Sequence, residues 1–410
     1  MPALNATQPP FGLMQDWPLT VDRVLEHARV NHGHREIVSR SVEGPIVRET
    51  YADLYARARQ VSTALLEDSV QPGDRIATLA WNGARHMELW FGAMGIGAVL
   101  HTVNPRLFPE QIAWIINDAG DTHLFFDLTF LPIVEQLAEK CPAVRRWVLM
   151  TDEAHAPPAG KIPNLAIYES FIAGKSRDVT WGNFDERTAA GLCYTSGTTG
   201  NPKGVLYSHR SNVLHSLTSL QRDSLGFSVD DVIMPIVPLF HANAWGITFS
   251  APAVGAKLVM PGSKMDGPSI YELMDAEKVT FSAAVPTVWL MLKQYLEETG
   301  KKLPHLDRIV VAGSAVPEAI LRSYEDDYGV KVFHAWGMTE MSPLGSMGAT
   351  TPEFREQGKD AVQRNKLKQG RPSFGVEMKI VDDNGNELPR DGKTTGHLVV
   401  RGPAIAGAYF

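Results

Sequence analysis

Apolar positions in the first part of the chain follow two alternating periods. Residues 51–68 place their apolar side chains three and four positions apart, which is the spacing of one helical face. Short apolar runs at 75–81, 98–102 and 123–127 are typical of buried strands. Because helical and strand-like segments alternate at this spacing, the pattern predicts βαβ units with parallel sheet.

The middle of the chain repeats this alternation, and the end of the chain departs from it. Runs at 279–285, 308–312 and 330–334 are strand-like, and the helical segments between them begin near prolines, a favoured early helical position. Further on, two strand-like runs flank a polar stretch with an Asn-Gly pair at 384–385, a strong hairpin signal. A small antiparallel unit is therefore predicted from about Gly370 onward.

The length of the chain sets the expected number of cores. With 410 residues it exceeds what one hydrophobic core usually holds, so two or more subdomains are expected. We predict an α/β fold with two βαβ-type subdomains, over 1–185 and 186–365, whose sheets are mainly parallel. A small antiparallel β-barrel-like subdomain is predicted over 366–410, and the polar stretch 352–366 is interpreted as a linker.

Composition and charge exclude several classes of function. Hydrophobic residues make up 44% and charged residues 21% of the chain, as in ordinary soluble globular proteins. A net charge of -7 argues against a nucleic-acid surface. No apolar run is long enough to span a bilayer, and no signal peptide is recognised. Cys141 and Cys193 lack metal spacing, and Cys193 is interpreted as inert packing, so a reducing, cytoplasmic compartment is expected.

A glycine-rich string at 194–204, "YTSGTTGNPKG", holds nothing that can fill a core. It offers hydrogen-bond donors and one cation to a ligand: the hydroxyls of Thr195, Ser196, Thr198 and Thr199, the unobstructed amides of Gly197 and Gly200, and the ammonium of Lys203. Such an inventory suits a polyphosphate. The spacing differs from the P-loop pattern, and "VLYSH" after it is strand-like, so a hairpin loop is predicted. A plain surface turn is the alternative interpretation.

The same string resembles the phosphate-loop signature of the adenylate-forming superfamily, which includes acyl- and aryl-CoA synthetases. Other strings are similar to further motifs of that family: "VPLFHANAWG" (237–246), "VAGSAVP" (311–317), "HAWGMTE" (334–340) and "TGHLVVRGPAIAGAYF" (395–410). The string "VNPRLFPEQIAWI" (103–115) is similar to the medium- and long-chain fatty acyl-CoA synthetase branch, including the methylthiopropionate-CoA ligases. The similarity runs from about Trp17 to Phe410.

This resemblance implies an ATP-dependent ligase that forms an acyl-adenylate, releases pyrophosphate and then forms a thioester with CoA. Its substrates would be ATP, CoA and a small carboxylic acid, with Mg²⁺ as the metal ion; nucleic acid is not a partner, and a homodimer is left open. The resemblance assigns the nucleotide to Gly313, Ser314, Ala315, His334, Ala335, Trp336, Gly337, Met338 and Thr339, with Trp336 stacking on the adenine, as well as to the glycine-rich string.

The resemblance also assigns the acyl group, the metal and the catalytic roles. The acyl group would contact His241, Trp245 as a gate, Gly313, Gly337 and Met338. Glu340 and Thr195 would hold Mg²⁺, and Lys203, His241, Thr339 and Glu340 would be catalytic. The strand pattern supports one shared cleft, because Gly313 and Glu340 each follow a predicted strand and ligands bind beyond the carboxyl ends of such strands. The alternatives are a solvated loop carboxylate for Glu340 and simple packing for His241 and Trp245.

Where the chain ends bears on the expected activity. In the family, a ribose-binding aspartate and a small C-terminal domain with the adenylation lysine follow the motif that ends here at Phe410. We therefore expect a shortened form of a longer ligase that lacks the small C-terminal catalytic domain, binds ATP, acyl-AMP or the acid, and turns over slowly or not at all.

Two other classes of function stay open on the sequence. One is a non-catalytic module that binds nucleotide or acid, and the other is a phosphoryl transferase or ATPase, which would produce ADP instead of AMP. Within the ligase interpretation, the acid is expected to be a fatty or other hydrophobic carboxylic acid. An aliphatic medium or long chain is favoured, and a short thioether acid or an arylalkanoic acid is the alternative.

Overall fold

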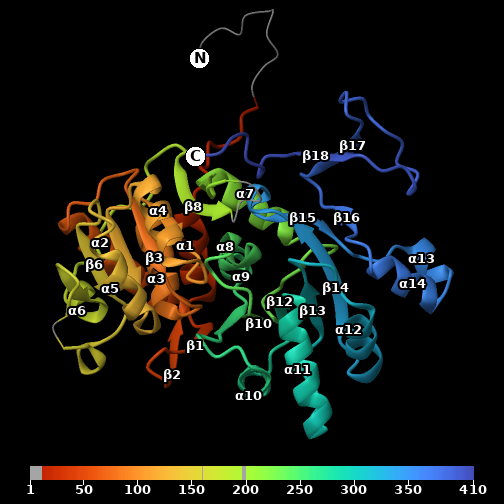
Figure 1. Ribbon diagram of the computed structural model, residues 1–410, viewed down its shortest axis with the longest axis horizontal. Coiled ribbons are helices and arrows are strands. Elements are labelled where there is room, and N and C mark those ends of the chain that lie inside the picture. Colours follow the sequence, from red (N-terminus) through yellow and green to blue (C-terminus); the bar gives the residue numbers. More distant parts are fainter. Residues whose placement is uncertain (1–11, 159, 196–199) are drawn as a thin grey trace, which may run out of the picture.

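The computed structural model describes residues 12–158, 160–195 and 200–410 (Figure 1). In these residues a seven-stranded sheet has the strand order β7-β6-β5-β3-β4-β8-β9. All neighbouring strands in it are parallel except the last pair, β8 and β9. Its strands are β3 (Arg75–Leu79), β4 (Val99–Thr102), β5 (His123–Phe126), β6 (Arg146–Leu149), β7 (Leu165–Ile167), β8 (Ala189–Thr195) and β9 (Lys203–Ser208).

A second, nine-stranded sheet has the order β16-β15-β14-β13-β12-β10-β11-β1-β2. Its central strands are parallel, and β2, β15 and β16 are antiparallel additions at its two edges. Its strands are β1 (Glu36–Arg40), β2 (Ile46–Thr50), β10 (Val232–Pro235), β11 (Lys257–Met260), β12 (Phe281–Ala284), β13 (Arg308–Val311), β14 (Lys331–Gly337), β15 (Leu344–Met347) and β16 (Arg371–Pro372).

Helices lie between the two sheets and on both outer faces (Figure 1). The inner helices, which contact one another, are α1 (Val21–His32), α2 (Tyr51–Glu67), α3 (Ala84–Gly95), α7 (His209–Ser219) and α9 (Ile247–Val254). Outside the seven-stranded sheet lie α4 (Pro109–Ala119), η1 (Leu128–Phe130) and α5 (Leu131–Leu137), and outside the nine-stranded sheet lie α10 (Gly267–Glu277), α11 (Pro286–Thr299) and α12 (Glu318–Arg322). Short elements are η2 (Glu153–His155), α6 (Tyr168–Ile172), α8 (Ala242–Trp245), η3 (Ser323–Asp327), η4 (Thr339–Met341), α13 (Pro352–Glu356) and α14 (Lys359–Lys366).

The largest core lies in the inner layer and takes side chains from both sheets. Leu25, Leu65 and Phe91 of the inner helices are fully buried there, together with Ile76 of β3 and Leu258 of β11. Full burial of an aliphatic or aromatic side chain of this size contributes about 1.5–3 kcal/mol. The shared core therefore fixes the two sheets relative to each other.

The mainly parallel α/β fold predicted from the sequence is confirmed, with an unexpected exchange of strands between its halves. The N-terminal hairpin β1–β2 belongs to the nine-stranded sheet, and β8–β9 complete the seven-stranded sheet. The sheets therefore do not part at the predicted boundary between 185 and 186. The division into subdomains stays a prediction.

The C-terminal region differs from the expectation in two respects. The predicted linker 352–366 forms α13 and α14, because Pro352 takes an early helical position and Ala361 and Gln363 become buried. The antiparallel pair is β17 (Glu377–Val381) with β18 (His397–Arg401), and β16 pairs with β15 instead. In the described residues this small sheet has two strands, so the antiparallel unit is found but its closure into a barrel is not.

Each large sheet has one reversal point, a topological switch point at which consecutive strands begin to be added on the opposite side of the sheet. In the seven-stranded sheet β3 connects to β4 on one side and β5 to β6 on the other, so the reversal falls between β3 and β5. In the nine-stranded sheet it falls between β10 and β12. Ligands of open α/β sheets bind beyond the carboxyl ends of strands at such points. Among the described residues, no helix is long and apolar enough to cross a membrane.

A single buried side chain joins these two reversal points. Asn82, just after β3, is fully buried, and its amide donates to the carbonyl oxygens of Pro235 at 2.7 Å and Val237 at 2.9 Å. Its side-chain oxygen accepts the Leu239 N–H at 2.7 Å. Asn82 therefore anchors the segment that follows β10 and leads to His241.

We expect Asn82→Ala to lower the free energy of unfolding by about 3 kcal/mol, because two carbonyls and one N–H would lose their partner at a buried site. The measurement is the shift of the urea midpoint. As a matched control, Asn117→Ala removes an exposed amide that donates to the Lys140 carbonyl, and about 0.5 kcal/mol or less is expected. Equal losses for the two variants would contradict the role given to Asn82.

Candidate functional site

The glycine-rich string connects two antiparallel strands, as its sequence predicts. Thr195 ends β8 and pairs in register with Lys203, which begins β9. Ser196, Gly197, Thr198 and Thr199 lie outside the described residues. Gly200 has a φ of +90°, a conformation that favours glycine. The helix after the hairpin, α7, begins at His209.

Lys203 and Glu340 both meet the last residues of the chain. The Tyr409 hydroxyl donates to Glu340 Oε1 at 2.6 Å, and Lys203 Nζ lies 4.9 Å from the centroid of the Tyr409 ring. The Phe410 N–H donates to the Gly204 carbonyl at 2.9 Å. This segment therefore connects the base of the hairpin to Glu340, a contact that the sequence alone does not predict.

The candidate metal ligands come from neighbouring elements. Glu340 lies on η4, which packs against β8, and β8 ends at Thr195. One carboxylate and one hydroxyl suit Mg²⁺, which takes few protein oxygens and keeps room for phosphate and water. The described residues contain no group of three or more His, Cys, Asp or Glu side chains that could hold a metal ion on their own.

A small, mainly apolar cavity gathers most of the predicted substrate residues. Its volume is about 70 Å³, and it lies at the carboxyl ends of β13 and β14. It is lined by the predicted residues His241, Trp245, Gly313, Ala335, Trp336, Gly337, Met338 and Thr339 and by Leu225, Ala242, Val310, Ala312, Pro343, Leu344 and Met347, which the sequence did not single out. The predicted acyl contacts therefore share one cavity.

Some predicted nucleotide residues lie elsewhere. Ser314 and Ala315 are exposed beside the cavity and do not line it. His334 is buried, and its Nδ1 lies 3.0 Å from the Leu367 carbonyl oxygen. Burial lowers the pKa of His334, so its imidazole is neutral near pH 7. The side chain of His334 thus packs against the segment after α14, and the nucleotide role stays a prediction for this residue.

The wall of the cavity that carries Trp245 has an unusual backbone. Consecutive residues are left-handed: Ala242, Asn243, Ala244, Trp245 and Gly246 have φ values of 44°, 60°, 48°, 57° and 83°. For residues with a Cβ this conformation costs about 1–2 kcal/mol each, and it persists only where the surroundings enforce it. The sequence offers Asn243 and Gly246 as its only hints.

Specific contacts hold this left-handed turn. The Asn243 amide donates to Asn212 Oδ1 at 3.1 Å, and Thr248 Oγ1 donates to the Asn243 carbonyl at 3.0 Å. A Cβ on Gly246 would lie 2.4 Å from the His215 ring, so only glycine fits there. The Leu344 N–H donates to His215 Nε2 at 3.1 Å, and burial lowers the pKa of His215 to about 4, so this ring is a neutral acceptor. The turn is thereby fixed to α7 and to β15.

His241 precedes the turn and lies at the mouth of the cavity. Its ring is exposed, yet desolvation by the surrounding protein, with the charge of Arg106 as a smaller cause, lowers the pKa of His241. A neutral imidazole at this place can donate one hydrogen bond to a carboxylate oxygen. Cys193, behind it, points its thiol toward the Phe240 carbonyl at 3.7 Å, and burial raises the pKa of Cys193, in agreement with its interpretation as packing.

Comparison with known proteins decides the family. Residues 25–410 match a family described as AMP-binding enzyme. The chain belongs to the AMP-binding enzyme family. A 3-methylmercaptopropionyl-CoA ligase of Ruegeria lacuscaerulensis is 46% identical to this AMP-binding enzyme over 98% of the chain and 74% of the relative. A medium-chain-fatty-acid–CoA ligase of Ectopseudomonas oleovorans is 44% identical over 98% of the chain and 73% of the relative.

Solved structures confirm the fold. An anthranilate CoA ligase in complex with anthranoyl-AMP superposes with a TM-score of 0.83 and 23% identity, over 97% of the chain and 73% of that structure. A long-chain-fatty-acid-CoA ligase from Archaeoglobus fulgidus gives a TM-score of 0.81 and 21% identity, over 98% and 79%. The resemblance to adenylate-forming acyl-CoA ligases is thus confirmed, and the enzyme is of the AMP-forming acid–thiol ligase type. The roles of individual residues stay predictions.

We expect Ala244→Gly to cost about 1–2 kcal/mol less stability than Ala251→Gly. Both alanines are fully buried, so both variants lose a buried methyl group. At Ala244 glycine relieves left-handed strain, whereas at Ala251, inside α9, glycine lowers helix propensity. The two free energies of unfolding from urea titrations decide the matter, and equal losses would mean that the turn carries no strain.

Proposed function

We propose that this enzyme converts a short apolar carboxylic acid, ATP and CoA into an acyl-CoA, AMP and pyrophosphate. The carboxylate oxygen attacks the α-phosphorus and pyrophosphate leaves; the CoA thiol, having lost its proton, then attacks the acyl carbonyl and AMP leaves. Both steps ask the protein for positioning and for stabilisation of charge. Family membership supports this reaction, and the cavity beside His241 supports the class of acid.

The size of the cavity carries the proposal about the acid. A volume of about 70 Å³ is room for a short tail of a few non-hydrogen atoms, since about 10–15 Å³ is the least that holds one water molecule. Its walls are apolar around Leu225, Trp245 and Met347. An aliphatic or thioether tail of that size fits, and the name of the relative that acts on 3-methylmercaptopropionate is consistent with it. A longer chain would require Trp245 to move.

Residues around the cavity have distinct proposed roles. The neutral imidazole of His241 would donate to the acid and orient the attacking oxygen. Lys203 would lie against the phosphates, and Glu340 with Thr195 would hold Mg²⁺, which supplies charge neutralisation for the departing pyrophosphate. Trp336, whose ring packs on the backbone of Gly345, would present its other face to the adenine.

The buried, unpaired thiols of Cys141 and Cys193 are consistent with a cytoplasmic location, which we propose as well.

The tail length can be tested by calorimetry with acyl-sulfamoyladenosines, stable analogues of acyl-AMP, bearing tails of two to twelve carbons. We expect affinity to rise about fourfold for each added CH₂ until the cavity is full, and then to fall. In Trp245→Ala the optimum should move to longer tails. An affinity in the wild type that rises steadily to twelve carbons would contradict the short acid. In a turnover assay, ADP as the product instead of AMP would refute the reaction.

Tyr409 provides a second test, because its hydroxyl occupies one oxygen of Glu340. We expect Tyr409→Phe to lower the Mg²⁺ concentration for half-saturation of ATP binding about fivefold, which corresponds to about 1 kcal/mol for the lost competing hydrogen bond. Tyr295→Phe is the control, since its hydroxyl contacts only Lys301 among the described residues. If Tyr409→Phe leaves the Mg²⁺ requirement unchanged, Glu340 does not hold the metal.

A further inference from the structure

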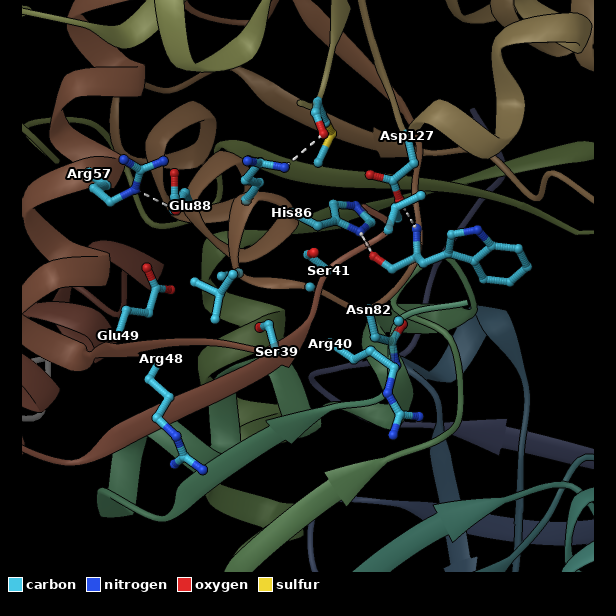
Figure 2. Close-up of a pocket in the computed structure, with 18 of the residues that line it drawn as sticks. Ser39, Arg40, Ser41, Arg48, Glu49, Arg57, Asn82, His86, Glu88 and Asp127 are labelled. Atoms are coloured by element: carbon cyan, nitrogen blue, oxygen red, sulfur yellow. Dashed lines mark hydrogen bonds and ion pairs between the residues drawn. The ribbon is translucent and has the colours of Figure 1, made fainter. Parts of the chain in front are cut away.

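A second cavity lies beside the inner layer, away from the proposed active site. Its volume is about 470 Å³, within the range of small-molecule sites, and its lining shares no residue with the cavity beside His241. It opens at the carboxyl ends of β3 and β5, where Asn82 and Asp127 stand, and thus at the reversal point of the seven-stranded sheet. Figure 2 shows this cavity, with Ser39 and Arg40 of β1 on another wall. Ligands of open α/β sheets bind at such positions.

The arginines that line the cavity already have partners in the protein. Arg57 donates to Glu88 at 2.7 Å and to Glu169 at 3.0 Å, and Arg85 donates to Glu169 at 2.8 Å and to Glu43 at 2.6 Å. The other two arginines of the lining donate to carboxylates that do not line the cavity. Arg40 donates to Glu272, and Arg48 donates to Glu36 and Glu277. The cavity therefore offers little free positive charge to an anion.

Two oxygens at the cavity, one hydroxyl and one carboxyl, lack hydrogen-bond partners among the described residues. Within the part of the chain that the structure describes, Ser39 Oγ and Glu49 Oε1 are buried without a hydrogen bond, as is Glu43 Oε2 behind the lining. Ser39 is only 3% exposed. Buried acceptors without partners are uncommon in native proteins, because each costs about 1–3 kcal/mol. A ligand that donates hydrogen bonds could supply the partners that these oxygens lack.

The carboxyl groups of Glu49 and Asp127 have raised pKa values, as expected of buried acids with too little positive charge nearby. Burial is the largest cause that raises the pKa of Glu49 well above its usual value, and repulsion from Glu88 is the next. Asp53 and Glu169 raise the pKa further, whereas the charge of Arg57 lowers it. Burial also raises the pKa of Asp127 to about 7, although its carboxylate accepts the Trp81 N–H at 2.7 Å. Figure 2 shows Glu49 and Asp127 on opposite sides of the cavity. A cation beside either group would favour its ionised form.

We propose that this cavity binds an organic diamine, with one ammonium group at Glu49 and Ser39 and the other at Asp127. A metal ion is disfavoured, because the described residues include no cluster of three or more His, Cys, Asp or Glu side chains placed to hold one. The volume also suits an extended molecule better than an ion. Ammonium groups would supply donors to the unpartnered oxygens and the charge that the carboxyl groups lack.

The site also has a physical connection to the proposed active site. Asn82 lines the cavity, and its side chain holds residues 235–239 before His241. A diamine that rigidifies this wall would therefore stabilise the segment that carries His241. Binding at the diamine site does not depend on the reaction proposed above, so the two proposals can fail separately.

Isothermal titration calorimetry of the whole chain with 1,4-diaminobutane tests the proposal. We expect saturable binding at pH 7 with net proton release, seen as a dependence of the heat on the ionisation enthalpy of the buffer, because Glu49 and Asp127 lose protons when the ammonium groups arrive. Butylamine, with one ammonium group, should bind at least tenfold more weakly, and inorganic phosphate should not bind at this site. Absence of saturable binding by the diamine, or equal affinity for butylamine, would overturn the proposal.

Two variants locate the site. We expect Glu49→Gln and Asp127→Asn each to weaken binding of 1,4-diaminobutane at least tenfold and to reduce the proton release, while Glu139→Gln, which changes an exposed glutamate after α5, leaves both unchanged. Circular dichroism establishes that each variant is folded. Equal affinity of Glu49→Gln and the wild type for 1,4-diaminobutane would show that the diamine binds elsewhere and would refute the site. The comparison with butylamine tests the need for two ammonium groups without any variant.

Discussion

The core between the two sheets is the constraint on which the rest of the structure depends. It buries helices from the first and middle parts of the chain against both sheets at once, so the carboxyl ends of the two sets of strands have fixed relative positions. The cavity beside His241 lies at the nine-stranded sheet, and the cavity proposed to bind a diamine is lined from both sheets, by β1 and β2 of one and by the ends of β3 and β5 of the other. Neither could keep its shape if the inner layer moved, because residues of both sheets meet at Asn82.

Much of this arrangement could be predicted from local sequence patterns. Apolar runs such as 308–312 and amphipathic segments such as 51–68 became the strands and helices expected of them, because burial follows the same periods in both cases. The hairpin after Thr195 was predictable from spacing, and the motifs identified eight of the fifteen residues that line the cavity beside His241. The strands, the helices, the hairpin and the motifs are all determined by residues that lie close together in the sequence.

The errors concern interactions between distant residues. Nothing near β1 indicates that it pairs with β11, and the polar stretch 352–366 forms helices because two of its side chains become buried in the fold. The left-handed turn over 242–246 could not be predicted from Asn243 and Gly246 alone, since His215 and Asn212 enforce it from another helix. The cavity proposed to bind a diamine is likewise lined by Ser39, Glu49 and Asp127 from three separate segments, none of which carries a recognisable motif.

The pairing of β1 with β11 has a consequence for how the chain is made. Ile37 pairs with Leu258, so the first hairpin must wait for 221 further residues before its edge is covered. At ribosomal rates of about 5–20 residues per second, this interval is roughly 10–40 s. During this time the free edge of β1 can pair with other chains, as unprotected strand edges do. The seven-stranded sheet can close much earlier, once β9 has emerged, so the order of synthesis would leave the nine-stranded sheet as the part of this enzyme most in need of a chaperone.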